Sequence, residues 1–196
     1  MSRRRRSGVI LLCVLAAIAF AFLDHAVVKH KVRPLLLGER AAGSDHALYH
    51  GRSFSVVRVI DGDTLDIDAS DDGQEYTRVR LLGIDTPETK GVAEPAYYGA
   101  EAAAFTTELA EGKEVALYLP RDRTRGYYGR LLAYVKLPDG DFLNELLLAE
   151  GYAYADTRFE HDLYNKYQQL ESMARARDKG LWREVRPDQM PNWLQK

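Results

Sequence analysis

Three short runs early in the chain alternate between apolar and polar positions. They are SFSVVRVI (53–60), TLDIDA (64–69) and EYTRVRLLGI (75–84), and Asp-Gly turns separate them. β-branched runs bounded by turn residues predict strands, and the tight turns predict antiparallel pairing. The sequence therefore predicts a three-stranded meander, in which the period of two puts Arg78 and Arg80 on one face of the third strand.

The rest of the chain carries three helical stripes and two more strand patterns. The predicted elements are a helix whose apolar stripe runs from Tyr98 to Leu109, strands over 114–120 and 129–137, a helix from Asp141 to Gly151, and a helix from Leu163 that stops at Gly180. Five short strands with a helix between the third and the fourth predict a small closed barrel with helices packed against it, an α+β fold.

The amino terminus has the pattern of an export signal. Four arginines precede an uncharged apolar run from Gly8 to Leu23. This run is short for a membrane span of about 20 residues, and no small-x-small cleavage site follows it. We expect residues 1–25 to be an uncleaved anchor, or a signal peptide if they are removed. The arginines would stay in the cytoplasm and place the rest of the protein outside it, in the periplasm or the extracellular space.

The sequence divides into an anchor, a linker, a folded domain and a tail. We expect the linker at 26–52, the domain at 53–186 and the tail at 187–196. His46 and His50, four residues apart, could offer two nitrogens to a metal if the linker were helical. No third ligand accompanies them, so ordinary polar linker residues are the alternative. The single cysteine, in the apolar run, excludes an intramolecular disulfide framework.

The charge of the chain is unevenly distributed. Residues 1–52 hold 9 Lys and Arg against 3 Asp and Glu, which leaves 18 basic and 26 acidic residues and a net charge of −8 for residues 53–196. Surfaces that bind nucleic acid without selectivity are usually basic. The composition therefore excludes an indiscriminate nucleic-acid binder, and any attraction for phosphate must be local.

Acidic residues stand where two of the predicted strands end. Asp61 and Asp63 follow the first strand, and Asp85, Thr86 and Glu88 follow the third. In a meander these strand ends can be neighbours, and carboxylate and carbonyl oxygens are the donors that a hard dication prefers. Glu88 could then act as a general base on a water beside the metal. Taken singly, each motif is also ordinary turn chemistry.

Several arginines lie close to these acids in an otherwise acidic domain. Arg80 precedes the second acidic turn, and RDRTRGYYGR contains Arg121, Arg123, Arg125 and Arg130. A metal and two arginines suit attack on a phosphodiester, because negative charge grows on the phosphoryl oxygens in the transition state. For Arg121 and Arg123, solvated surface charge is the simpler interpretation.

These motifs together resemble the staphylococcal nuclease (thermonuclease) family over about residues 54–183. The motifs are VIDGDTL, RLLGIDTPE, YGR followed by LLAYV, and a closing GLW, in this order. The resemblance implies an OB-fold, a five-stranded barrel with three helices. It also implies calcium-dependent endonucleolytic hydrolysis of DNA and RNA that leaves 3′-phosphates.

The resemblance assigns a role to individual residues. By the matched motifs, these are Asp63 and Asp85 as calcium carboxylates, Thr86 as a carbonyl ligand, Glu88 as general base, Arg80 and Arg130 as phosphate clamps, Tyr128 beside the substrate phosphate, and Asp61 as a nearby supporting acid. A second substrate tyrosine is harder to place, and Tyr154 is a candidate. We expect single-stranded or flexible substrates to be favoured, because the strand must bend into a local pocket, and we expect no obligate protein partner.

Two other functions fit parts of the sequence. The first is a non-catalytic OB-fold module that binds nucleic acid, which the longer loop at 124–129 would favour if it disturbed the catalytic geometry. The second is a membrane-tethered calcium-binding adaptor, which needs the acids but not the arginines. Tyr97, Tyr127, Tyr152 and Trp193 could stack on bases, but such residues more often belong to a half-buried core and are assigned no role.

Overall fold

Five strands close into a barrel in the order β1–β2–β3–β6–β5. The computed structural model describes residues 43–89 and 96–195. Its strands are β1 (Ser53–Asp61), β2 (Thr64–Ile67), β3 (Thr77–Leu81), β4 (Ile84–Asp85), β5 (Glu114–Tyr118), β6 (Leu131–Lys136) and β7 (Tyr154–Ala155). Its helices are α3 (Gly99–Ala110), α4 (Leu143–Ala149), α5 (Tyr164–Ala176) and the 3₁₀ turns η1 (Gly180–Arg183) and η2 (Pro187–Gln189).

The barrel confirms the predicted fold class. β1, β2 and β3 form the expected antiparallel meander, and β3 also pairs with β6 in parallel, which closes the sheet through β5. Val79 and Leu81 are buried inside, whereas Arg78 is exposed and the Arg80 side chain, 13% exposed, is largely covered on the opposite face. The alternation of β3 therefore decides which side chains fill the core and which are available to a site.

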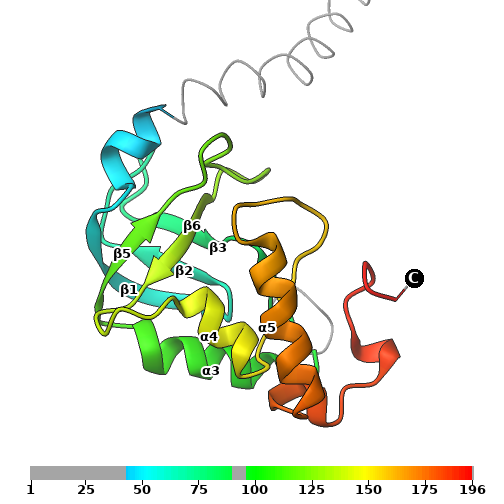
Figure 1. Ribbon diagram of the computed structural model, residues 1–196. Coiled ribbons are helices and arrows are strands. Elements are labelled where there is room, and N and C mark those ends of the chain that lie inside the picture. The colour runs from blue at the N-terminus through cyan, green and yellow to red at the C-terminus, as the bar shows by residue number, and fades with distance from the viewer. Residues whose placement is uncertain (1–42, 90–95, 196) are drawn as a thin grey trace, which may run out of the picture. The chain divides into compact units, whose positions relative to one another are not determined.

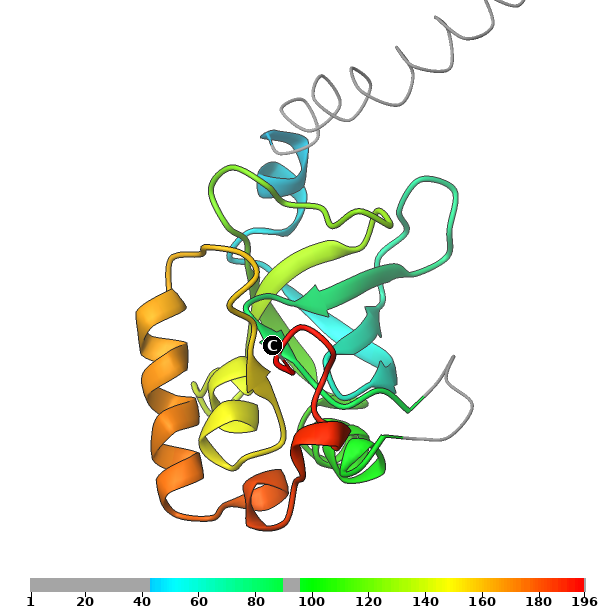
Figure 2. The same cartoon turned by 90° about the vertical axis from the view of Figure 1, so that its right-hand side faces the viewer.

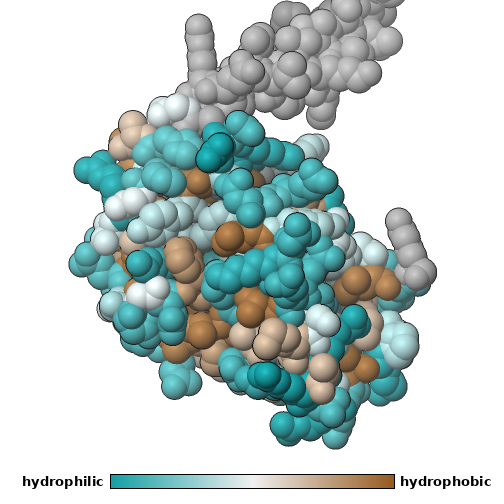
Figure 3. All heavy atoms as spheres, in the orientation of Figure 1, coloured by the Kyte–Doolittle hydropathy of each residue, from teal (hydrophilic) through white to brown (hydrophobic). Residues whose placement is uncertain are grey.

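The helices α3, α4 and α5 lie beside and below the barrel in Figures 1 and 2. Ala102 and Ala110 of α3 are fully buried, and Phe105 and Leu109 pack against the barrel core, so the predicted apolar stripe faces the barrel. The chain then turns at Gly112, which has φ +73°, a backbone angle that glycine adopts without strain. The face of the molecule seen in Figure 3 is mostly hydrophilic, with small separated apolar areas.

The folded unit begins earlier than we expected. Residues 43–49 are helical, and Tyr49 is buried in the barrel core with its hydroxyl 3.1 Å from Oγ1 of Thr77. Nε2 of His46 donates to the carbonyl of Pro120 at 2.9 Å, and Nδ1 of His50 accepts from the backbone of Leu119 at 3.0 Å. Placing all of 26–52 in a linker was therefore wrong, and both histidines serve to attach this helix to the barrel rather than to form a metal pair.

The predicted anchor at residues 1–25 lies outside the described part of the chain. Across residues 43–89 and 96–195, no helix is long and apolar enough to cross a membrane. At the other end of the chain, η2 and the residues after it do not form a separate tail. Met190, Trp193 and Leu194 pack against a second apolar cluster that contains Tyr154, Leu181 and Trp182.

Candidate active site

The turn between β1 and β2 is fixed by hydrogen bonds to Asp61. Its carboxylate accepts from the backbone of Gly62 at 2.8 Å, and from the backbone and hydroxyl of Thr89 at 3.3 and 3.0 Å. A Cβ on Gly62 would lie 2.8 Å from Oγ1 of Thr86, so only glycine lets this turn approach the loop after β4 so closely. Asp61 therefore joins the two acidic motifs, which matches the supporting role expected for it.

Asp63 points from this turn toward the loop that carries the second motif. Its Oδ2 accepts a hydrogen bond of 2.8 Å from the backbone of Thr86, and its Oδ1 accepts one of 3.0 Å from the hydroxyl of Thr64. The β-sheet register explains this position, since Thr64 pairs with Arg80 and the backbone of Leu81 donates to the carbonyl of Asp63. The ends of the first and third predicted strands are thus neighbours, as the meander predicted.

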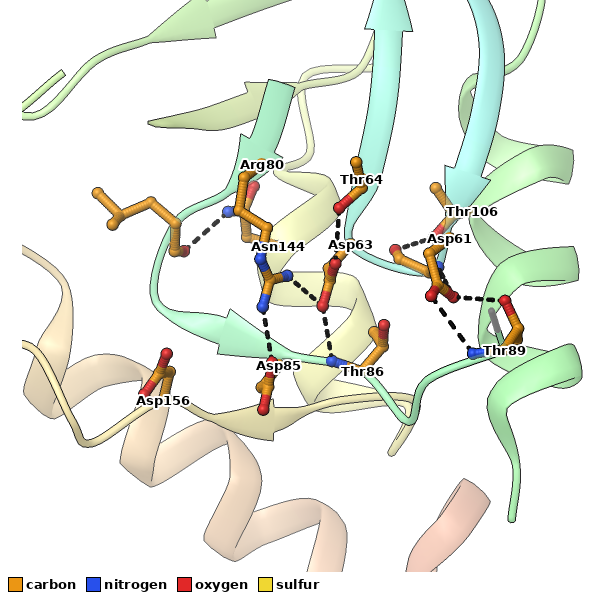
Figure 4. A network of polar contacts seen from close by, with 12 residues as sticks. Asp61, Asp63, Thr64, Arg80, Asp85, Thr86, Thr89, Thr106, Asn144 and Asp156 are labelled. Atoms are coloured by element: carbon orange, nitrogen blue, oxygen red, sulfur yellow. Dashed lines mark hydrogen bonds and ion pairs between the residues drawn. The ribbon is translucent and has the colours of Figure 1, made fainter. Parts of the chain in front are cut away.

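The guanidinium of Arg80 lies between the two carboxylates (Figure 4). It forms an ion pair with Asp63, and its Nη2 donates to Oδ1 of Asp85 at 2.6 Å. Burial lowers the pKa of Arg80, and Arg130 lowers it further, whereas Asp85 opposes the shift. An arginine stays protonated under such conditions. Arg80 therefore keeps its charge at the point where the two acids meet.

Arg130 lies close enough to Arg80 for the two charges to interact. Its charge acts on Arg80, and its guanidinium carbon lies 5.8 Å from the ring centroid of Tyr128. Nε of Arg130 is buried and has no hydrogen-bond partner among the described residues. The predicted clamp arginines are thus brought together, and one of them has an unused buried donor.

Glu88 faces the acids although the residue as a whole is exposed. Partial burial of its carboxyl group, together with the carboxylates of Asp61 and Asp85, raises its pKa. A raised pKa makes a carboxylate a stronger base, which suits the predicted removal of a proton from water.

The donors at the centre fit a hard dication in part. The side chains of Asp63 and Asp85 are only 7% and 14% exposed, and one positive guanidinium stands between two negative groups. Within the described residues, no three Asp, Glu, His or Cys side chains form a complete ligand set. Calcium takes about six to eight oxygen ligands. The carbonyl of Thr86, water and substrate oxygens would have to complete the shell around the two carboxylates.

A pocket of about 680 Å³ opens beside Arg80. Its lining combines cations with aromatic rings, and the residues of these two kinds are Arg80, Arg121, Arg123, Arg130, Arg158, Tyr127, Tyr128, Phe159 and His161. Tyr127 and Tyr128 are 81% and 80% exposed. Five arginines and four acidic residues, Asp122, Asp156, Glu160 and Asp162, thus share the lining, and Arg80 belongs both to the pocket wall and to the acid cluster.

One of the arginines in RDRTRGYYGR, Arg125, is paired with acidic residues away from the phosphate clamp. Arg125 donates to Asp45 at 2.7 and 2.9 Å, forms an ion pair with Asp71, and donates to the carbonyl of Gly129 at 3.1 Å. Asp45 also accepts from the hydroxyl of Thr124 at 2.7 Å. Arg125 therefore ties the helical residues 43–49 and the β2–β3 turn to the loop that carries Arg130, and it is not available to substrate.

Three residues at the site were assigned no role from the sequence, and one assignment was wrong. Asp156, Arg158 and Trp193 reach the site through the pairing of β7 with β4 and through the C-terminal residues. Tyr154, the candidate for a second substrate tyrosine, is 1% exposed and packs edge-on against Trp182. The segment GYAYA (151–155) contains two tyrosines, and its pattern does not indicate which of them is buried.

Comparisons with known proteins agree on one family. The family model described as "Staphylococcal nuclease homologue" matches residues 78–184. An "Uncharacterized endonuclease" of Escherichia coli O157:H7 is 35% identical over 146 residues, which cover 74% of this chain and 83% of that protein. A "Thermonuclease" of Staphylococcus intermedius is 40% identical over 134 residues, which cover 67% of this chain and 77% of that protein. The "Endonuclease YncB" of Bacillus subtilis (strain 168) is 38% identical over 120 residues, 59% of this chain and 54% of that protein. The chain therefore belongs to the staphylococcal nuclease family and is a hydrolase of the nuclease type.

Proposed function

We propose that this protein is a calcium-dependent endonuclease that hydrolyses DNA and RNA and leaves 3′-phosphates. The observation that carries the proposal is the contact of Arg80 with both Asp63 and Asp85, next to Arg130 and the arginine-lined pocket. Endonucleases and thermonucleases among the relatives support the reaction class.

Each residue of the site has a separate task in this mechanism. Asp63 and Asp85, with the carbonyl of Thr86, would hold the calcium ion. When bound, calcium supplies Lewis-acid polarisation of a phosphoryl oxygen. Arg80 and Arg130 donate hydrogen bonds to the phosphoryl oxygens as their negative charge grows.

Glu88 accepts the proton of the water that attacks phosphorus. The bond from phosphorus to the 5′-oxygen breaks and the leaving oxygen takes a proton from a solvent water, so the products are a 3′-phosphate and a 5′-hydroxyl. Tyr128 lies beside Arg130, where its hydroxyl is available to the substrate phosphate. Asp61 holds the turn and the loop together and does not take part in the reaction.

Single-stranded or locally flexible substrates fit this site best. Five arginines line one pocket of a domain whose net charge is −8, so a nucleic acid gains most attraction where its backbone enters that pocket. A stacked duplex must be deformed to do so. We therefore propose faster cutting of single strands than of duplexes of the same sequence.

The decisive experiment follows the cutting of a labelled single-stranded DNA by the full chain, with calcium and then with excess chelator. Glu88→Gln and Arg130→Ala should each slow cutting by about 100-fold or more. The matched controls Glu108→Gln and Arg177→Ala, at exposed positions, should cut at the wild-type rate. The product should accept a polymerase extension only after its 3′-phosphate has been removed.

The competing function is a binding module without catalysis. Tight binding of the same DNA without cutting, at any calcium concentration, would favour that module over the nuclease. Cutting that persists in excess chelator would contradict the calcium requirement but not the nuclease function.

We also propose that residues 1–25 anchor the protein to a membrane with the nuclease outside the cytoplasm. The support is the sequence pattern of four arginines followed by sixteen uncharged residues. Accessibility of the domain to protease added outside intact cells tests this orientation, and protection from it would contradict the proposal.

A further inference from the structure

The C-terminal residues reach the candidate metal site through Trp193. Its indole Nε1 donates a hydrogen bond of 2.8 Å to Oδ2 of Asp85, which lies 108 positions earlier in the chain. The Trp193 ring also packs against the apolar cluster around Trp182. The end of the chain is therefore attached to a carboxylate of the site, although the sequence predicts only a tail there.

Asp85 is held on both of its oxygens. Oδ1 accepts from Arg80 at 2.6 Å, and Oδ2 contacts Nη2 of Arg158 at 3.2 Å in addition to Trp193. The guanidinium carbon of Arg158 lies 4.7 Å from the Trp193 ring centroid, and Asp156 accepts from the same guanidinium at 2.8 and 2.9 Å. Trp193 and Arg158 thus support each other while they contact Asp85.

The local backbone alone gives Asp85 little support. It ends β4, which is two residues long and pairs only with the equally short β7. An indole is a donor only and carries no charge. Trp193 can therefore fix the orientation of the Asp85 carboxylate without neutralising the charge that attracts a cation. Hydrogen-bond partners of this kind typically contribute about 10–100-fold to metal affinity.

We propose that Trp193 is a positioning residue that orients Asp85 for the divalent cation, an inference that rests on the proposed function. The C-terminal residues that carry Trp193 are then part of the metal site. Removing the indole donor weakens cation binding although Trp193 does not contact the cation.

The test is a calorimetric titration of calcium into the full chain and into Trp193→Phe. Phenylalanine keeps an aromatic ring against Arg158 and the apolar cluster but has no N–H donor. Calcium affinity should fall about tenfold or more, with thermal unfolding in chelator close to that of the wild type. The matched control is Trp182→Phe, since the Trp182 indole N–H has no hydrogen-bond partner among the described residues. This control should bind calcium with wild-type affinity.

Fluorescence gives a second readout that does not depend on activity. The chain has two tryptophans, so Trp193 is the only one in Trp182→Phe. Its emission should change on calcium addition with the midpoint found by calorimetry.

The outcomes separate the inference from the function on which it rests. Equal affinity of Trp193→Phe and the wild type would overturn the inference and leave the calcium site intact. Tighter binding by Trp193→Phe would also overturn it, because the Trp193 indole would then compete with the cation for Asp85. A wild type that binds no calcium would overturn both the inference and the calcium-dependent mechanism.

Discussion

Oδ1 of Asp85 accepts a hydrogen bond of 2.6 Å from Arg80, and the same guanidinium pairs with Asp63. The proposed phosphate clamp and the proposed metal carboxylates are thus in direct contact. A change in one of these groups must alter the charge and the orientation of the others. This coupling gives the first prediction.

Arg80→Gln should lower kcat/KM by at least about 100-fold, because a donor to the growing phosphoryl charge is lost. In chelator the variant should also be less stable by about 3 kcal/mol, since Asp63 loses its counter-charge and Asp85 keeps only that of Arg158. Calcium should restore part of that stability. Urea unfolding with calcium and with chelator measures both effects, and wild-type stability of Arg80→Gln in chelator would contradict the account.

The Asp66 carboxylate links stability to pH. It accepts from Nε of Arg58 at 2.7 Å and from Nε of Arg78 at 2.8 Å. Burial alone would raise the pKa of Asp66, but hydrogen bonds from Arg78 and Arg58 outweigh it and hold the pKa below its usual range. The folded-state pKa is therefore lower than the unfolded value of about 3.9. The resulting stabilisation is complete above that unfolded value and is lost as the pH falls through the folded one.

Asp66→Asn should accordingly reduce the free energy of unfolding at pH 7 by about 1.5–3 kcal/mol. Below about pH 4 its stability should fall less steeply with acid than that of the wild type. Urea unfolding at pH 7 and at several values between about pH 2 and 5 tests this. Parallel pH profiles for the two proteins would show that the Asp66 ion pairs do not contribute.

The contact of Asp45 with Arg125 predicts that a residue near the start of the folded unit supports the substrate loop. Asp45→Asn leaves a largely buried guanidinium with less counter-charge and should cost about 2 kcal/mol or more of stability. Because Arg125 also donates to the carbonyl of Gly129, the position of Arg130 should loosen and KM should rise.

The control for this change is Asp72→Asn, at an exposed position with φ +44° that asparagine also adopts readily. It should retain wild-type stability and KM. Equal stability of Asp45→Asn and Asp72→Asn would refute the role assigned to the Asp45–Arg125 contact.

The sequence predicted the barrel because its strands alternate clearly and end at Asp-Gly turns. The sequence also predicted that Asp63 and Asp85 lie close together, since both stand at strand ends of one meander. The pairing of β4 with β7 could not be predicted, because two residues are too few to show a pattern. The sequence could not distinguish Arg125 from its neighbouring arginines, because its partner Asp45 is 80 positions away. Trp193 contacts Asp85 only through tertiary packing. Local sequence patterns therefore predicted the strands, the helices and the residue types of the site. Long-range contacts determine which charged side chains are available to substrate.

The most direct test of the calcium site measures the rate of single-stranded DNA cutting against calcium concentration. The proteins compared are the wild type, Asp85→Asn and the control Asp68→Asn, which removes the same charge at an exposed position. We predict that Asp85→Asn needs at least about tenfold more calcium and that Asp68→Asn behaves as the wild type. If Asp85→Asn showed the wild-type rate and calcium dependence, Asp85 would not hold the cation and the central claim would be wrong.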